Sequence, residues 1–148
     1  MADSDFKNRQ IYFPDNWTRH SNGEVISSEK YKPDLSFANE NGKIVCLLES
    51  SSTNDRKVGV GEMCLADKFF LDHKVDGILI FSLCGKSQYR PRPKTQAQYL
   101  EPYFRHLKRF GQPHGVRDIY FIDESDFESL HWMALDERFK ALAYVLKA

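Results

Sequence analysis

The sequence lacks a net charge, a long apolar segment and a cysteine framework, and each absence excludes a class of protein. Its 21 Lys and Arg residues balance 21 Asp and Glu residues, so the overall charge does not indicate a partner. No stretch of it approaches the ~18 continuous apolar residues that a membrane-spanning helix needs, and its first residues lack the apolar core of a signal peptide. We therefore expect a cytoplasmic protein with no membrane association.

The few cysteines and histidines do not predict a metal site or disulfides. Cys46, Cys64 and Cys84 are odd in number, widely spaced and each placed in an apolar run. We expect them to be buried free thiols in a reducing compartment. The five histidines show no metal-ligand spacing.

What the sequence does contain is enough apolar material for one packed domain spanning 1–148. Hydrophobic residues make up 41% and aromatic residues 14%, which argues against disorder. The charges are unevenly placed, with a basic block over 86–109 and an acidic block over 118–137. Such a distribution can present a face that binds polyanions although the whole chain is neutral.

The pattern of apolar and polar residues predicts strands that alternate with helices. The expected order is a hairpin over 32–49, a helix from the N-cap candidates at 51–55 to about 74, a strand over 78–84, a helix over 97–110, a strand over 117–122 and a final helix over about 134–147. Alternation of this kind implies crossover connections and a sheet covered on both faces. The predicted fold class is α/β, with a mixed β-sheet flanked by helices.

Two acids stand at matching positions of the predicted hairpin. Asp34, preceded by Pro33, begins its first strand, Glu49 ends its second, and the turn at 39–42 lies midway between them. Pairing across that turn brings the two carboxylates together, where they repel each other unless a hard cation lies between them. Mg²⁺ is bound in this way, by one or two carboxylates with water and phosphate oxygens completing its shell.

The combination of Pro33-Asp34, a hairpin turn and Glu49-x-Ser51 before a helix resembles the PD-(D/E)XK nuclease superfamily, which includes many restriction endonucleases. The resemblance covers about 30–125. It implies that 1–29 and the final helix are additions to the core that vary among members of the family. It implies a restriction endonuclease-like core and a Mg²⁺-dependent endonuclease, with Mn²⁺ as a substitute ion. Asp34 and Glu49 match the metal-binding acids of the family.

The sequence departs from the family at the position of its lysine, where Ser51 stands. Ser51 shares a strand face with Glu49 and is a catalytic candidate, although capping of the next helix is a sufficient role for it. Lys57 is the first candidate to replace the lysine, and Lys30 and Lys32 are alternatives.

The family also often adds an acid from an N-terminal helix. Glu24 and Glu29 are the candidates for that position in this chain.

A loop rich in cations and containing a tyrosine is the candidate contact with nucleic acid, with DNA the expected partner. Its candidate residues are Lys86, Tyr89, Arg90, Arg92 and Lys94. Cations suit phosphates and an aromatic ring suits base stacking, although a solubilising surface loop would have the same composition.

Two functional hypotheses follow. The first is a metal-dependent nuclease, acting as a homodimer where both strands of a duplex are cut. The second is a nuclease-fold protein without catalysis that binds nucleic acid or protein, which the serine at position 51 favours.

Overall fold

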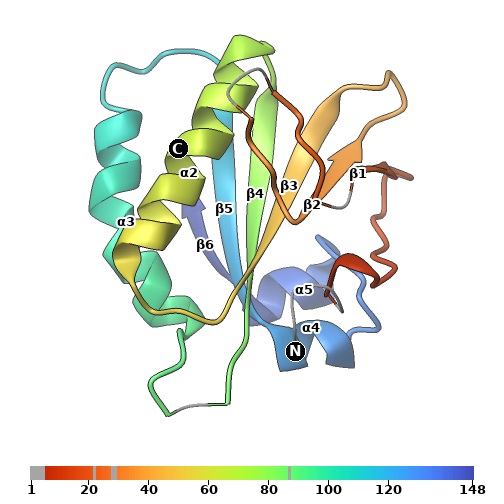
Figure 1. The fold of residues 1–148 in the computed structure, drawn as a ribbon, viewed down its shortest axis with the longest axis vertical. Coiled ribbons are helices and arrows are strands. Elements are labelled where there is room, and N and C mark those ends of the chain that lie inside the picture. The colour runs from red at the N-terminus through yellow and green to blue at the C-terminus, as the bar shows by residue number, and fades with distance from the viewer. Residues whose placement is uncertain (1–5, 22, 28–29, 87) are drawn as a thin grey trace.

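The computed structural model describes residues 6–21, 23–27, 30–86 and 88–148. In this part of the chain one sheet contains the strands Thr18–Ser21 (β1), Leu35–Ala38 (β2), Ile44–Ser51 (β3), Asp76–Leu83 (β4), Gly115–Asp123 (β5) and Tyr144–Lys147 (β6). The strands lie side by side in chain order (Figure 1). Strands β3, β4 and β5 are parallel, and the outer pairings are antiparallel. The predicted α/β class with a mixed sheet is confirmed.

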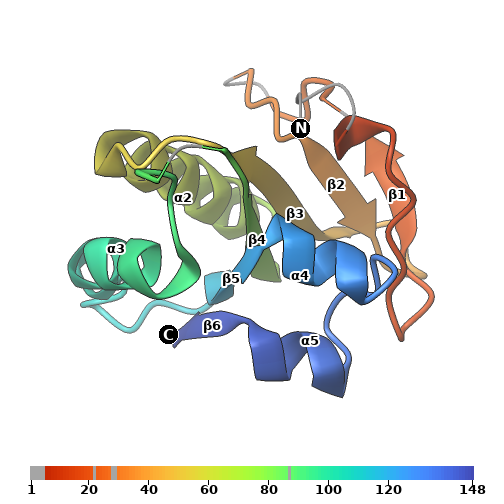
Figure 2. The same ribbon diagram turned by 90° about the horizontal axis from the view of Figure 1, so that it is seen from below.

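Helices cover both faces of the sheet. The helices are Arg56–Asp72 (α2), Pro93–Leu107 (α3), Glu124–Ser129 (α4) and Glu137–Leu142 (α5). Figure 2 shows α2 and α3 on one side of the sheet and α4 and α5 on the other. The connections from β3 to β4 and from β4 to β5 run through α2 and α3, as parallel strands require.

The turn of the β2–β3 hairpin is stabilised by the Asn39 side chain and by the backbone conformation of Gly42. The Asn39 side chain accepts hydrogen bonds from the backbone N–H groups of Asn41 and Lys43 at 3.0 and 3.1 Å. Gly42 adopts a φ of 77°, which favours glycine. This turn sets the register that pairs Leu35 with Leu48, so the residues just beyond that pair also face each other.

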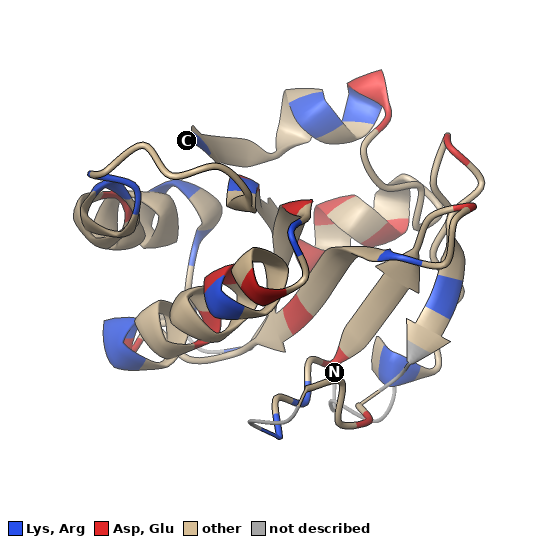
Figure 3. Ribbon diagram, turned by 90° about the horizontal axis from the view of Figure 1, so that it is seen from above, with Lys and Arg blue, Asp and Glu red and all other residues tan. Residues whose placement is uncertain are grey.

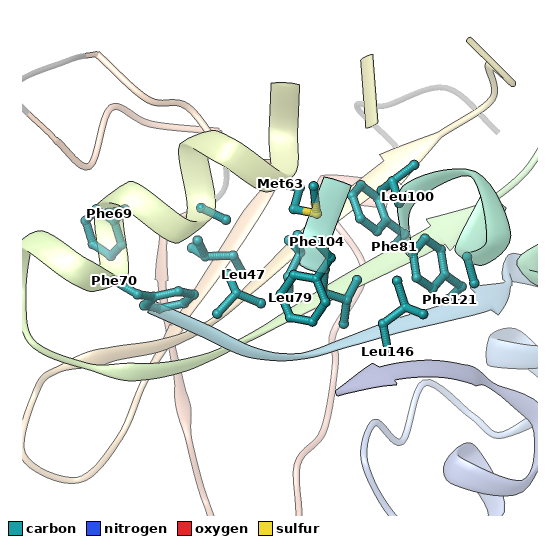
Figure 4. Close-up of a cluster of buried hydrophobic side chains, with 14 of the residues drawn as sticks. Leu47, Met63, Phe69, Phe70, Leu79, Phe81, Leu100, Phe104, Phe121 and Leu146 are labelled. Carbon is teal, nitrogen blue, oxygen red and sulfur yellow. The ribbon is translucent and has the colours of Figure 1, made fainter. Parts of the chain in front are cut away.

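The two faces of the sheet carry separate cores. On the α2 and α3 face, residues such as Leu47, Phe70 and Phe121 form the cluster drawn in Figure 4. On the opposite face, Leu48 and Ile80 belong to a second cluster that includes residues of α4 and α5. Neighbouring residues of β3 therefore point alternately to α2 and to α4.

The N-terminal turn, residues 6–9, docks on the second core. The Phe6 side chain is fully buried there and meets the Trp132 ring edge-on at 6.4 Å. Arg19 on β1 donates hydrogen bonds to the backbone carbonyls of Lys7, at 2.8 Å, and of Arg9. The turn is thus held by apolar burial on one side and by a guanidinium on the other.

Two sequence-based predictions about local structure are wrong. The segment 134–147 is not one helix, because α5 ends at Leu142, Ala143 is extended and β6 follows. The open edge of β5 supplies hydrogen-bond partners for those last residues, which outweighs a short helical pattern. Cys64 is exposed on α2, whereas Cys46 and Cys84 are buried as expected.

A buried ion pair connects α2, the end of α3 and the start of β5. Lys108 Nζ lies 2.5 Å from Asp67 Oδ1, and their side chains are only 9% and 5% exposed. The same Asp67 oxygen accepts a hydrogen bond from the backbone N–H of Val116 at 2.8 Å. Removing one partner would leave a charge in an apolar setting without compensation.

We therefore expect Lys108→Met to lower the free energy of unfolding by about 3 kcal/mol or more, measured by urea denaturation. Lys68→Met is the control, because Lys68 and Asp72 form an ion pair whose side chains are 56% and 50% exposed. That variant should lose less than about 0.5 kcal/mol. Equal losses in both variants would contradict a structural role for the buried pair.

Candidate metal centre

The hairpin holds Asp34 and Glu49 through reciprocal contacts with opposite strands. The backbone N–H of Asp34 donates to Glu49 Oε1 at 2.8 Å. In return, the backbone N–H of Ser50 donates to Asp34 Oδ2 at 2.7 Å. The prediction that the hairpin brings these two acids together is confirmed, although Asp34 lies just before β2 and not within it.

Glu62 on α2 is a third carboxylate at this place. It is hydrogen-bonded to Glu49, which is only 5% exposed. Burial, the contact with Glu62 and the charge of Asp34 raise the pKa of Glu49 to about 11. Asp34, Glu49 and Glu62 are called the acid cluster below, and it retains a proton at neutral pH.

Tyr31 closes the buried side of the acid cluster. Its side chain is 4% exposed, and its hydroxyl is buried without a hydrogen-bond partner among the described residues. Burial raises the pKa of Tyr31 well above its usual value, and the charges of Glu49, Glu62 and Asp34 raise it further. A neutral phenol is therefore kept beside the carboxylates, where it can donate a hydrogen bond.

Lys7 brings a positive charge to the acid cluster from the N-terminal turn. Its Nζ lies 3.9 Å from Asp34 Oδ1, and the two side chains are 33% and 18% exposed. Lys7 is distant from Asp34 in sequence, and the sequence contains no pairing signal between them. The sequence analysis did not identify Lys7 or Glu62 as residues of this site. For Glu62, its position on the helix that directly follows Glu49 is a signal that could have indicated it.

Ser51 and Lys57 do not complete the cluster in the way that the sequence predicted. The Ser51 hydroxyl donates to the Thr53 carbonyl at 3.3 Å. Ser51 is the last residue of β3, and Asp55 caps α2 by accepting from the Lys57 N–H at 3.0 Å. The prediction that Ser51 caps the next helix is therefore wrong, because three residues lie between Ser51, where β3 ends, and Asp55, the N-cap of α2.

The Lys57 side chain is exposed and lines a hollow together with Tyr103 of α3. Lys57 precedes Glu62 by five residues, which turns the two side chains about 140° apart around the helix axis. Lys57 therefore faces α3 and Glu62 faces the sheet end that carries Glu49. The structure gives Lys7, and not Lys57, as the cation beside the acids.

The other candidates for the site are exposed or lie outside the described residues. Lys30, Lys32 and Glu24 are exposed. Glu29 lies outside the described residues. Among the described residues, the third acid comes from α2.

The basic loop, residues 88–94, follows β4, enters α3 at Pro93 and lies beside the loop that follows β3. Asn54 donates a side-chain hydrogen bond to the Tyr89 carbonyl at 2.7 Å, which ties the two loops together. The Tyr89 side chain is 72% exposed. Lys86, Arg92 and Lys94 are also exposed.

Arg90 differs from the other candidates of this loop, because it is 2.8 Å from Asp123 in a largely buried ion pair. This contact joins the basic and acidic blocks, so the two blocks do not form separate faces. Figure 3 shows basic and acidic residues interspersed over the ribbon.

The acid cluster offers the oxygen ligands that Mg²⁺ prefers. Among the described residues, no three or more His, Cys, Asp or Glu side chains are grouped so that they could hold a metal ion. Asp34 and Glu49 form a two-carboxylate set, which suffices for Mg²⁺ when water and substrate oxygens supply the other ligands. The donor chemistry therefore fits, with substrate as part of the shell.

The chain matches no known family model, no curated protein and no solved structure. Within the described ranges, none of the helices combines the length and apolar content that crossing a bilayer requires.

The raised pKa of Glu49 predicts a pH-dependent loss of stability. Its ordinary value is 4.5 and its value in the fold is about 11, so between these limits only the folded chain holds the proton. The free energy of unfolding should then fall as the pH rises, by at most about 1.4 kcal/mol per pH unit. Glu49→Gln keeps an acceptor for the Asp34 N–H and removes this dependence.

We therefore expect Glu49→Gln to gain stability over the wild type as the pH rises from about 6 to 9, measured by urea denaturation in EDTA. Glu40→Gln, in the exposed turn, is the control and should show no such trend. A Glu49→Gln variant that differs from the wild type by the same amount at every pH would contradict the prediction.

Proposed function

We propose that this protein is a metal-dependent nuclease that hydrolyses phosphodiester bonds in nucleic acid, with DNA as the expected substrate. The observation that carries the proposal is the acid cluster at the carboxyl end of a central parallel strand, where Glu49 is buried against Asp34 and Glu62. Crowded carboxylates destabilise a fold unless a proton or a cation separates them. Open α/β sheets bind their ligands at this end of the strands.

The residues of the cluster have distinct tasks in this proposal. Asp34 and Glu49, each held by a backbone N–H of the opposite strand, are the ligands of a Mg²⁺ or Mn²⁺ ion. The bound ion polarises the phosphoryl group and lowers the pKa of the attacking water. Glu62 takes over the proton that Glu49 gives up.

Lys7 places its ammonium beside Asp34, where it can attract the phosphate and offset the negative charge that grows during attack. The attacking water passes a proton to bulk solvent as it adds to phosphorus, and the P–O bond to the leaving oxygen breaks as that oxygen takes a proton from solvent. The basic loop is tied to the same sheet end by Asn54 and would hold the strand on either side of the cut.

We expect wild-type protein to cleave labelled DNA in the presence of Mg²⁺ or Mn²⁺ and not in EDTA. Asp34→Asn and Glu49→Gln should each lower the cleavage rate on the order of 100-fold or more, because each removes a metal ligand. Glu40→Gln, an exposed acid of the β2–β3 turn, should cleave like the wild type. RNA is assayed alongside DNA to define the substrate.

The outcomes separate two functions. A protein that binds DNA and does not cut it with either ion would be a nuclease-fold binding protein, which the absence of a lysine at position 51 favours. Cutting that survives both acid substitutions would show that the acid cluster is not the catalytic centre. Cutting both strands of a duplex would require two copies of so small a domain, so we propose a homodimer for that reaction.

The basic loop predicts a salt dependence that differs among its cations. Arg92→Met and Lys94→Met should each weaken DNA binding and reduce the slope of log affinity against log salt by about 1. Arg90→Met should change the slope less, because Arg90 is already paired with Asp123. Lys140→Met, on exposed α5, is the control, and binding is measured by fluorescence anisotropy with Ca²⁺ in place of Mg²⁺.

A further inference from the structure

A polar hollow lies beside the acid cluster, where β4 and β5 end. Its volume is about 430 Å³, and its lining includes Cys84, Lys86, Arg90, Asp123, Glu124 and Glu128. Cys84 connects the hollow to the acid cluster, because its Sγ lies 3.8 Å from the Ser50 hydroxyl. Ser50 in turn donates its backbone N–H to Asp34.

Glu124 is the unexplained group of this hollow. It is only 7% exposed, and its Oε1 is buried without a hydrogen-bond partner among the described residues. Burial raises the pKa of Glu124, against the opposing charge of Arg9, and the charges of Glu128 and Asp123 raise it further. A buried acceptor without a donor costs stability, so a ligand that supplies N–H groups would be favoured here.

Other charged residues of the hollow are either paired with each other or exposed to solvent. Arg90 and Asp123 neutralise each other at 2.8 Å, and Asp123 also accepts from the Ser125 hydroxyl at 3.1 Å. Lys86 is exposed at the rim, where it can meet a phosphate. The hollow thus combines the buried Glu124 acceptor with two exposed charged residues, Lys86 and Glu128, and a nucleotide with its base against Glu124 and its phosphate at Lys86 suits this arrangement.

We propose that this hollow binds one unpaired guanine nucleotide of the nucleic-acid strand, with the Glu124 carboxylate accepting hydrogen bonds from guanine N1–H and N2–H. Guanine is the base whose pairing edge offers two adjacent N–H donors, which match the two oxygens of a carboxylate. Adenine and cytosine place a ring acceptor beside their amino group, and thymine flanks its single N–H with two carbonyls. The choice of a nucleic-acid strand as the source of this nucleotide rests on the proposed function.

The experiment titrates the full, isotope-labelled chain with each of the four 5′-deoxynucleoside monophosphates in metal-free buffer and follows the amide NMR signals. We expect dGMP to bind on the order of tenfold more tightly than the other three. Its largest shifts should fall on the lining residues, such as Gly85 and Ser125. Glu124→Gln should abolish the preference, because an amide offers one acceptor and sets its own N–H against the base.

Asp126→Asn is the matched control, since Asp126 is an acid of the same short helix that does not line the hollow. It should keep the preference for dGMP. The proposal is overturned if another base binds best, if the shifts fall elsewhere, or if Glu124→Gln retains the preference. Should Glu124→Gln fail to fold, the ranking and shift map of the wild type decide.

Strands with and without guanine are also assayed for cleavage, because the all-thymidine strand tests the acid cluster without this hollow. If neither strand is cut while dGMP still binds in the hollow, the nuclease proposal alone is refuted.

Discussion

The exchange of hydrogen bonds between Asp34 and β3 is the constraint on which the candidate centre depends. Each carboxylate accepts from a backbone N–H of the opposite strand, so neither acid can turn away without leaving that donor unsatisfied. The contact also fixes the hairpin register beyond the last strand pair. A slip of one residue would send Glu49 to the α4 face of the sheet.

Burial of that pair determines what surrounds it. Glu49 lies among apolar residues of the α2 face, so its charge cannot be screened by water. A shared proton between Glu49 and Glu62 and the ammonium of Lys7 beside Asp34 are two different ways to tolerate such crowded carboxylates.

The sequence predicts the part of this centre that local geometry controls. The Asn39-Glu40-Asn41-Gly42 turn and the apolar run before Glu49 predict the hairpin, and the hairpin alone brings Asp34 and Glu49 together. The order of strands and helices from β2 through β5 is equally readable, because each element has its own periodicity.

The rest of the centre depends on tertiary packing. The position of Glu62 follows from the rotation of α2 about its axis, which is set by packing against the sheet. Lys7 reaches Asp34 only because Phe6 is buried in a distant core. At the C-terminus, four residues with an ambiguous pattern join the sheet because β5 offers a free edge, which no local signal reveals.

The docking of Phe6 has a consequence for the order in which the protein is assembled on the ribosome. Phe6 packs against Phe127, Phe139 and Trp132, which are synthesised much later than the N-terminal turn. The hairpin acids are therefore made and paired while the surface that receives the N-terminal turn does not yet exist. Lys7 can join Asp34 only after the segment that carries Phe127 and Phe139 has emerged, so the nascent protein lacks this ammonium beside its acids until then.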